Sequence, residues 1–452
     1  MTSLRISRTG FAPVRRFSVI LGAVASLAAA PILSPAPAQA AAVSAERGQG
    51  IDDFYAARGE RPLWFQAGRP TAAASQLLAL LSTSSADGLD PGRYKTEAVA
   101  KALQRARDGD ERAIRKADVL LSSQFVAYAR DLKAAGSPEM KYIDPSLPKG
   151  PPAPRELLEA AAAASSLDRY VADMGWMNPA YAPLRRALVS GNFQNQRQRD
   201  LLRINLERAR VLPATGRYII VNTAMQRLYM YEGDRLADSM KVVVGQQQAD
   251  RKTPPIAGYL HFAALNPYWN VPPDLVWDDV GVYVEKYGVG YLASRGYQVL
   301  SDWGDNPSVV DPATVDWNAV KEKRIEIRVR QLPGPQNFLG EVKYAFTNPL
   351  GVYLHDTPRK DLLKEKTRLF SGGCIRLEDA ARLGRWLFGR PLKAQSEAPD
   401  IIVPLEQPIP VYVTYLTAVP SGSSITYLDD VYGWDAQRLA QVDSGEAAVA
   451  TR

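Results

Sequence analysis

The sequence predicts a multidomain α+β protein, in which an N-terminal all-α domain precedes a mainly β domain that carries an insertion. Residues 41–212 are rich in Ala and Leu, with apolar residues spaced three to four apart. From Arg217 onward, short runs rich in β-branched and aromatic residues alternate apolar with polar positions. A long irregular stretch, 270–332, separates two groups of these runs.

Residues 1–40 have the pattern of a cleavable targeting segment. A basic start without acidic residues precedes the apolar run Phe17–Leu33, and Ala38-Gln39-Ala40 forms a small-x-small cleavage site. The uninterrupted apolar part is shorter than the roughly 20 residues that a spanning helix needs. We therefore expect cleavage after Ala40, no stable membrane anchor afterwards, and a periplasmic protein. Arg15-Arg16 matches the twin-arginine export signal only in part, so the Sec route and the twin-arginine route both stay open.

Composition restricts the partners and the source of stability. The formal net charge is +7, and removal of the four arginines of the targeting segment leaves +3 (7 − 4). Such a small charge and the lack of a phosphate-binding pattern exclude nucleic acid as an expected partner. The 452 residues, 46% of them hydrophobic, suffice for two or three cores. A single cysteine cannot form an intramolecular disulfide, so stability must come from packing.

The N-terminal domain, 41–212, is expected to be a helical scaffold without a catalytic constellation. The rings of Trp64, Tyr128 and Trp176 are expected in its core, and proline-rich breaks are expected at 87–91 and 137–152. The helices expected from apolar spacing are Thr71–Leu81, Thr96–Arg107, Glu111–Lys133, Pro154–Ala163 and Gln194–Arg210.

The second domain, 213–419, is expected to be sheet-rich. Four tryptophans in the insertion 270–332 argue against disorder, so we expect it to be folded. The segment 420–452 is expected to pack back on this domain, with a loose polar end over 435–452. The expected strands are Tyr218–Val221, Arg227–Tyr231, Asp238–Val244, Tyr259–Leu265, Lys343–Phe346, Val352–His355 and Pro410–Thr417, with one helix at Glu378–Leu387.

Cys374, the only cysteine, is the strongest candidate for chemistry. A thiol becomes a nucleophile as the thiolate, and a nearby histidine such as His355 can take its proton. Gly372 and Gly373 allow a sharp turn with positive φ, which would aim the N–H groups of Gly373 and Cys374 at one oxyanion. A free cysteine is often a small buried hydrophobe. The flanking glycines and the expected export favour the nucleophile.

The two histidines differ in their surroundings. Alternation along Val352–His355 places Tyr353 and His355 on one face of the strand. His261, the rival base, is expected to be half-exposed on the strand Tyr259–Leu265 with no chemistry near it. One cysteine and two separated histidines do not form a zinc site, so no metal is expected.

These residues resemble a known family. His355-Asp356-Thr357, with Cys374 lying 19 residues after His355 (374 − 355) inside Ser371–Leu377, resembles the active-site signature of L,D-transpeptidases of the YkuD type. These cysteine enzymes remodel bacterial peptidoglycan. Residues 218–245, 252–254, 266–272 and 429–433 resemble the large periplasmic branch of that family, and the helical region resembles its N-terminal scaffold more loosely. Gly372 stands where many members have a second histidine, and no peptidoglycan-binding module is recognisable between Leu167 and Leu212.

The resemblance implies a β-sandwich-like YkuD-type domain whose insertion, 270–332, is a lid over the substrate cleft. It further implies that Cys374 attacks the carbonyl between the third and fourth residues of a donor stem peptide, and that an acceptor amine resolves the thioester. His355 would be the general base, oriented by the backbone carbonyl of Asp356. Substrate would contact Tyr353, Ser371, Gly372 and Arg376, and for Arg376 a structural ion pair is an equal alternative.

The expected function is therefore a peptidoglycan L,D-transpeptidase that makes 3-3 or 1-3 cross-links without a cofactor. Two alternatives stay open: a carboxypeptidase or hydrolase that releases wall-linked protein with the same Cys/His site, and a catalytically silent wall-binding scaffold. The expected partners are peptidoglycan stem peptides and other cell-wall synthesis enzymes. The resemblance also implies acylation by carbapenems.

Overall fold

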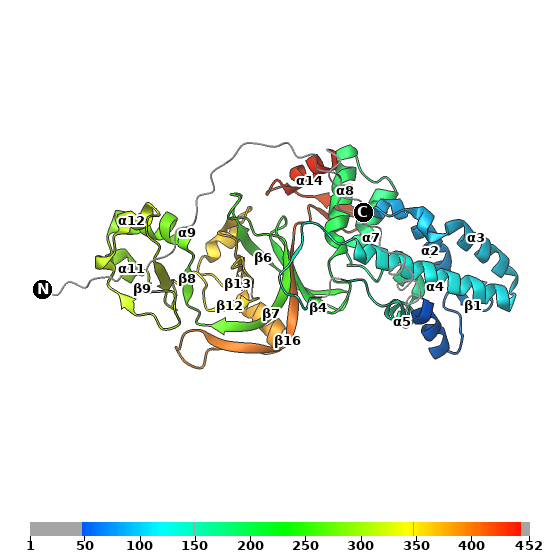
Figure 1. The fold of residues 1–452 in the computed structure, drawn as a ribbon, viewed down its shortest axis with the longest axis horizontal. Coiled ribbons are helices and arrows are strands. Elements are labelled where there is room, and N and C mark those ends of the chain that lie inside the picture. Colours follow the sequence, from blue (N-terminus) through cyan, green and yellow to red (C-terminus); the bar gives the residue numbers. More distant parts are fainter. Residues whose placement is uncertain (1–47, 148–149, 347, 444–452) are drawn as a thin grey trace, which may run out of the picture.

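The computed structural model describes residues 48–147, 150–346 and 348–443 of the chain (Figure 1). The expected targeting segment, 1–40, and the last part of the expected loose end, 444–452, lie outside the described residues. Within the described ranges, none of the helices has both the length and the apolar character needed to cross a membrane.

The N-terminal region is helical, as predicted. Residues 48–57 form a first helix. Trp64, Tyr128 and Trp176 are buried in its core, where the rings of Phe125 and Trp176 meet edge to face at 4.9 Å, so that prediction is confirmed. The elements are the hairpin β1 (Phe65–Gln66) and β2 (Arg69–Pro70), and the helices α2 (Ala72–Ser82), η1 (Ser84–Asp87), η2 (Pro91–Tyr94), α3 (Thr96–Arg105), η3 (Ala106–Asp108), α4 (Glu111–Ala134), α5 (Pro154–Ala163), α6 (Leu167–Ala172), α7 (Tyr181–Val189) and α8 (Gln196–Arg210).

A ten-stranded sheet forms the centre of the molecule. The strand order is β12-β13-β15-β6-β5-β4-β16-β7-β3, and β12 also pairs with β7, so the sheet closes on itself. Its interior is apolar, with Ile219, Val242, Leu354 and Ile375 among the fully buried side chains. The elements are β3 (Lys141–Tyr142), β4 (Arg217–Asn222), β5 (Arg227–Glu232), β6 (Arg235–Gly245), β7 (Ile256–Leu265), β12 (Val342–Ala345), β13 (Leu354–His355), η6 (Lys360–Lys364), β14 (Leu369–Ser371, paired with β6), β15 (Ile375–Leu377), α13 (Ala380–Phe388) and β16 (Ile401–Thr414).

The insertion is a separately packed unit. Its four strands form their own sheet in the order β10-β9-β11-β8, over an apolar cluster that includes Val271, Val284 and Leu292. Figure 1 shows it at the end of the molecule opposite the helical region, with the closed sheet between them. The elements are β8 (Trp269–Val271), α9 (Pro273–Leu275), the π-helix η4 (Val276–Val280), α10 (Gly281–Tyr287), α11 (Gly290–Ser294), β9 (Tyr297–Leu300), β10 (Val309–Val310), η5 (Pro312–Thr314), α12 (Trp317–Lys321) and β11 (Arg328–Gln331).

Two segments differ from the sequence predictions. The expected break 137–152 contains β3, which pairs in parallel with β7 and so ties the helical region to the sheet. Strand β16 begins nine residues before the expected Pro410 (410 − 401), and its first half, which contains Pro404, pairs with β7 up to an irregularity between Pro404 and Ile409.

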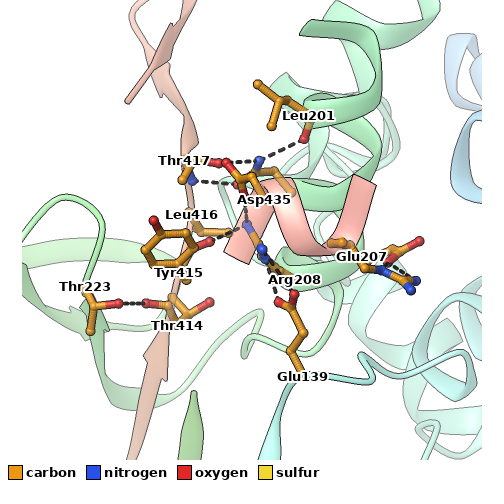
Figure 2. A network of polar contacts seen from close by, with 12 residues as sticks. Glu139, Leu201, Glu207, Arg208, Thr223, Thr414, Tyr415, Leu416, Thr417 and Asp435 are labelled. Atoms are coloured by element: carbon orange, nitrogen blue, oxygen red, sulfur yellow. Dashed lines mark hydrogen bonds and ion pairs between the residues drawn. The ribbon is translucent and has the colours of Figure 1, made fainter. Parts of the chain in front are cut away.

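The chain end is the clearest correction. Residues 435–443 are not loose: they belong to α14 (Trp434–Asp443), which follows the hairpin of β17 (Ala418–Ser421) and β18 (Ser424–Tyr427). Asp435 is buried, and its carboxylate accepts a hydrogen bond of 2.5 Å from Arg208 of α8 (Figure 2). Arg208 also donates to Glu139 at 2.6 Å and to the carbonyl of Tyr415 at 3.0 Å. A buried carboxylate–guanidinium network holds the end of the chain against α8, and composition alone did not indicate it.

Candidate active site

The parallel pair β13–β15 brings the candidate residues together. Leu354 lies opposite Ile375, and both side chains are fully buried in the sheet interior. His355 lies opposite Arg376 in the same ladder. Because side chains alternate along a strand, His355 and Arg376 face away from the interior, as do the residues that precede Leu354 and Ile375. Those residues are Tyr353 and Cys374.

This outer face forms the floor of a cleft of about 1560 Å³. The predicted substrate contacts Tyr353, Ser371, Gly372 and Arg376 all line it, together with Cys374 and His355. Gly373 and Asp356 are not among the residues that line it. The insertion contributes the facing wall, including Leu275 of α9 and three tyrosines of α10 and α11.

The Cys374 thiol is protonated at rest. Burial raises the pKa of the thiol, and a hydrogen bond from the backbone of Tyr353, with the positive charges of Arg376 and Lys343, opposes that rise only in part. Its Sγ lies 3.4 Å from the carbonyl oxygen of Gly351, to which the thiol can donate. Both residues are described, and no hydrogen bond joins Cys374 to His355 in this structure.

His355 is held as a neutral proton acceptor. Only 3% of its surface is exposed, and its Nδ1 lies 2.5 Å from the carbonyl oxygen of Asp356. A carbonyl only accepts, so Nδ1 carries the proton and Nε2 carries the lone pair. Burial first, and then the charge of Arg376, lower the pKa of His355 to about 3. The predicted backbone orienter, Asp356, lies where that role requires.

The two glycines before Cys374 do different things. Gly373 has φ of +121°, a region that favours glycine, whereas Gly372 has no positive φ, so the prediction for Gly372 is wrong. A Cβ at Gly372 would meet only Leu275, at 3.9 Å. The N–H of Gly373 donates to Ser371 Oγ at 3.2 Å, and that hydroxyl donates to the Cys374 carbonyl at 2.6 Å. The Gly373 N–H, predicted for the oxyanion, is therefore engaged within the loop in this structure.

The buried hydroxyl group of Thr253 supports the loop before Cys374, and sequence reasoning missed it. Thr253 Oγ1 accepts from the N–H of Gly245 and donates to the carbonyl of Gly373, both at 2.8 Å. Tyr432, near the chain end, donates to the Gly245 carbonyl at 2.7 Å. A Cβ at Gly245 would lie 2.0 Å from the carbonyl oxygen of Arg251, so the chains approach too closely there for a side chain. The motif 252–254 was noted, but nothing in it indicates a partner 120 residues away.

Arg376 lacks a protein partner for part of its guanidinium. Its Nε is buried without a hydrogen bond, and burial lowers the pKa of the guanidinium. In the part of the chain that the structure describes, Arg376 forms no ion pair, which removes the support for the alternative of a structural ion pair. A buried donor without a protein partner, on a residue that lines the cleft, fits an anionic ligand group.

His261 lies elsewhere. Its side chain on β7 is 43% exposed, 3.4 Å from Asp144, and it does not line the cleft. The prediction of a half-exposed strand residue is confirmed. The described residues contain no group of three or more His, Cys, Asp or Glu side chains placed to hold a metal ion.

Comparison with known proteins agrees with this geometry. Residues 216–391 match the family model of the L,D-transpeptidase catalytic domain, YkuD. Residues 49–188 match the model of a scaffold domain, so the predicted order of a helical region and a mainly β YkuD-type domain is confirmed.

One curated relative and one solved structure extend the comparison. A Haemophilus influenzae protein named "Putative L,D-transpeptidase" is 32% identical over 251 residues, which cover 54% of this chain and 50% of that protein. The chain thus spans about half the length of this relative. The structure described as the Ldtfm-avibactam carbamoyl enzyme shares 14% sequence identity with a TM-score of 0.21, over 45% of this chain and 51% of that one.

Proposed function

We propose that this protein is a peptidoglycan L,D-transpeptidase, with Cys374 as the nucleophile and His355 as the general base. The observation that carries the proposal is the pairing of β13 with β15, which places both side chains on one outward face within a YkuD domain. A packed hydrophobic cysteine would point inward with Leu354 and Ile375; this one lines the cleft.

The first half-reaction follows from the protonation states. The thiol turns from the Gly351 carbonyl toward Nε2 of His355, which takes its proton as Sγ attacks the carbonyl carbon between the third and fourth stem-peptide residues. The C–N bond then breaks, and the proton on His355 goes to the leaving amine of the terminal D-amino acid. The product is a thioester on Cys374. General-base assistance of this kind contributes about 10²–10⁴-fold.

The second half-reaction regenerates the thiol. An acceptor amine, after loss of a proton to His355, attacks the thioester carbonyl, and the thiolate leaves and recovers that proton. The acceptor amine decides whether the product is a 3-3 or a 1-3 cross-link. Arg376, with its unpaired Nε, would bind a carboxylate of the stem peptide. The insertion would cover the bound peptide as a lid.

Labelling by a carbapenem tests the nucleophile. Intact-mass spectrometry of the protein treated with a carbapenem should show one covalent adduct, and Cys374→Ala should show none. His261→Gln, which changes a residue outside the cleft, should label like the parent. An adduct that persists in Cys374→Ala would refute the assignment.

Product analysis tests the reaction. Purified disaccharide-tetrapeptide incubated with the protein should yield cross-linked dimers, with release of one D-amino acid per dimer, measured by mass spectrometry. Tripeptide without dimers would instead identify a carboxypeptidase, in which water replaces the acceptor amine. No product from either reaction, in a protein that still takes up carbapenem, would refute the proposed substrate.

A further inference from the structure

Three tyrosine rings of the insertion, two of them exposed, form a cluster on the wall of the Cys374 cleft. Tyr283, Tyr287 and Tyr291, here called the tyrosine platform, have ring centroids 5.2–6.2 Å apart. Their planes are nearly parallel, with angles of 13°, 24° and 26°. All three rings line the same cleft as Cys374 and His355.

Local sequence explains how the platform forms. Tyr283 and Tyr287 are four residues apart on α10 and so share one face of the helix. Gly288, with φ of +76°, ends α10 and donates its N–H to the carbonyl of Val284 at 2.8 Å. The chain then turns directly into α11, which sets Tyr291 beside the other two rings.

Packing of the insertion explains Tyr291, which lies against its apolar cluster, but not the other two rings of the platform. Tyr283 is 44% exposed and Tyr287 is 58% exposed, and neither belongs to the apolar cluster of the insertion or packs against it. Val284, on the same helix, supplies the buried contact instead. Two large rings held side by side in water contribute little to folding, because most of their apolar surface stays hydrated. An exposed aromatic patch inside a cleft instead marks a binding surface.

The charges of the cleft restrict the ligand. Among its described lining residues, four are arginines and three are aspartates. These residues are Arg251, Arg295, Arg359, Arg376, Asp250, Asp274 and Asp279. The positive and negative charges of the cleft therefore nearly cancel, and the cleft does not favour a polyanion. The volume of about 1560 Å³ also exceeds the roughly 300–1,000 Å³ typical of a small-molecule pocket. The cleft therefore has room for a neutral group beside the peptide.

A sugar ring fits this combination best. One face of a pyranose carries C–H groups, which are attracted to the electron-rich face of an aromatic ring, while its hydroxyl and amide groups project from the edge. The amides of Gln246, Asn270 and Gln336, which also line the cleft, can bond such edge groups. An extended peptide would instead need an exposed strand edge or separate side-chain pockets.

We propose that the tyrosine platform binds a sugar ring of the glycan strand that carries the stem peptide. The inference rests on the proposed function for the identity of the sugar, since the stem peptide of peptidoglycan is attached to a glycan. The platform holds the strand while Cys374 reacts with the peptide branch.

Kinetics with matched substrates test the proposal. The double variant Tyr283→Ala/Tyr287→Ala is compared with the parent on disaccharide-tetrapeptide and on the same tetrapeptide without sugar. The ratio of kcat/KM for the two substrates should fall about tenfold, mainly through KM, because each aromatic contact contributes a factor of a few. Tyr283→Phe/Tyr287→Phe keeps the rings and should keep the ratio.

The control is Trp303→Ala, which removes another exposed aromatic ring of the insertion. Trp303 is 54% exposed and lies outside the cleft, so its loss should leave the ratio as in the parent. Equal losses on both substrates in the tyrosine double variant would show that the platform contacts the peptide, and would overturn the proposal. An unchanged ratio would overturn it as well.

Direct binding separates this proposal from the proposed reaction. Calorimetry with a peptide-free N-acetylhexosamine tetrasaccharide should show binding to the parent and to Trp303→Ala, and at least tenfold weaker binding to Tyr283→Ala/Tyr287→Ala. That result supports sugar binding by the tyrosine platform even if no cross-linked product is ever detected. Equal affinity in the double variant, or no binding to the parent up to millimolar sugar, would overturn it.

Discussion

The strand pair β13–β15 and the insertion that faces it form two walls of one cleft in different ways. On the strand pair, His355 is fixed by the Asp356 carbonyl, and the loop before Cys374 is bonded through Ser371 and Thr253. On the insertion, the wall consists of short helices with exposed rings. A group that transfers a proton must be held within about 0.5 Å, whereas a surface that stacks on a ligand tolerates more. The contrast fits the proposals above, in which the strand pair carries the chemistry and the insertion binds the ligand.

The largest expected effect tests the strand pair. His355→Gln removes the proton acceptor and should lower the rate of acylation by a carbapenem by about 10²-fold or more. His261→Gln should leave the rate nearly unchanged, because His261 lies on the outside of β7, away from the cleft. Stopped-flow acylation rates measure both. Equal losses in the two variants would refute the choice of base.

Low pH should destabilise the folded protein through His355. With a folded pKa of about 3 and an unfolded pKa of about 6.5, His355 takes up a proton only in the unfolded chain between these pH values. Stability is therefore full above pH 6.5 and falls as pH falls toward 3, by about 1.4 kcal/mol for each pH unit.

The measurement is the free energy of unfolding in urea at pH 7 and pH 4.5. The parent should lose on the order of 2 kcal/mol more than His355→Gln over this interval. Other groups titrate alike in the two proteins, so the difference isolates His355. Identical losses would mean that its ring is not held neutral by burial.

A smaller effect distinguishes the two glycines of the loop. Gly373→Ala forces a residue with a side chain to adopt φ of +121°, which costs about 1–2 kcal/mol. If the loop moves to relieve this strain, the acylation rate should fall by a factor of about 5–30. Gly372→Ala has no such strain and meets only Leu275. Acylation rate and melting temperature should both fall further for Gly373→Ala. The reverse order would show that the turn does not depend on Gly373.

The smallest effect concerns the contact between the two walls. Arg251, beside the loop of Gly373, lies 3.5 Å from Asp278 of η4 in an ion pair that is open to solvent on the Asp278 side. Such pairs contribute about 0–1 kcal/mol. Asp278→Asn should change acylation by no more than about threefold at low salt, and by less near 1 M salt. Glu285→Gln, which loses an ion pair inside the insertion, is the matched control and should change nothing. A loss above tenfold for Asp278→Asn would mean that Asp278, which also pairs with Lys323 at 3.0 Å, couples the two walls.

Most of the closed sheet was predictable, because strands with one apolar face alternate over several residues. The meander β4–β6 lies where the alternation predicted it. Strand β3 has only two residues and no period of its own, so only its pairing with β7 reveals it. The early half of β16 contains prolines, which normally argue against a strand. Helix α14 was missed because two buried charges, Asp435 and Arg438, look in sequence like a solvated end.

The candidate site, like the fold, has parts that the sequence predicted and parts that it did not. The place of His355 and Cys374 in one cleft and the positive φ of Gly373 were predictable, because a lone cysteine, a nearby histidine and a glycine turn leave local signals. The residues that support the loop before Cys374 were not predictable. Thr253 and Tyr432 act through single hydroxyl groups on partners 120 and 187 residues away, and a lone hydroxyl gives no sequence pattern. The partner of Gly373 within the loop, Ser371, was expected to contact substrate, and its hydroxyl is instead bonded to the loop backbone.

The position of β16 has a consequence for synthesis of the chain. This strand lies between β4 and β7 in the sheet, and the residues after it join α8 through contacts more than 200 residues apart, such as Asn205 with Thr417 and Arg208 with Asp435. A nascent chain cannot close the sheet until nearly all of it has left the ribosome. Loop closure over such separations is slow, so we expect the sheet around Cys374 to be completed late in folding. We therefore expect a stage in which the sheet is still open and Cys374 has not yet reached its place beside His355.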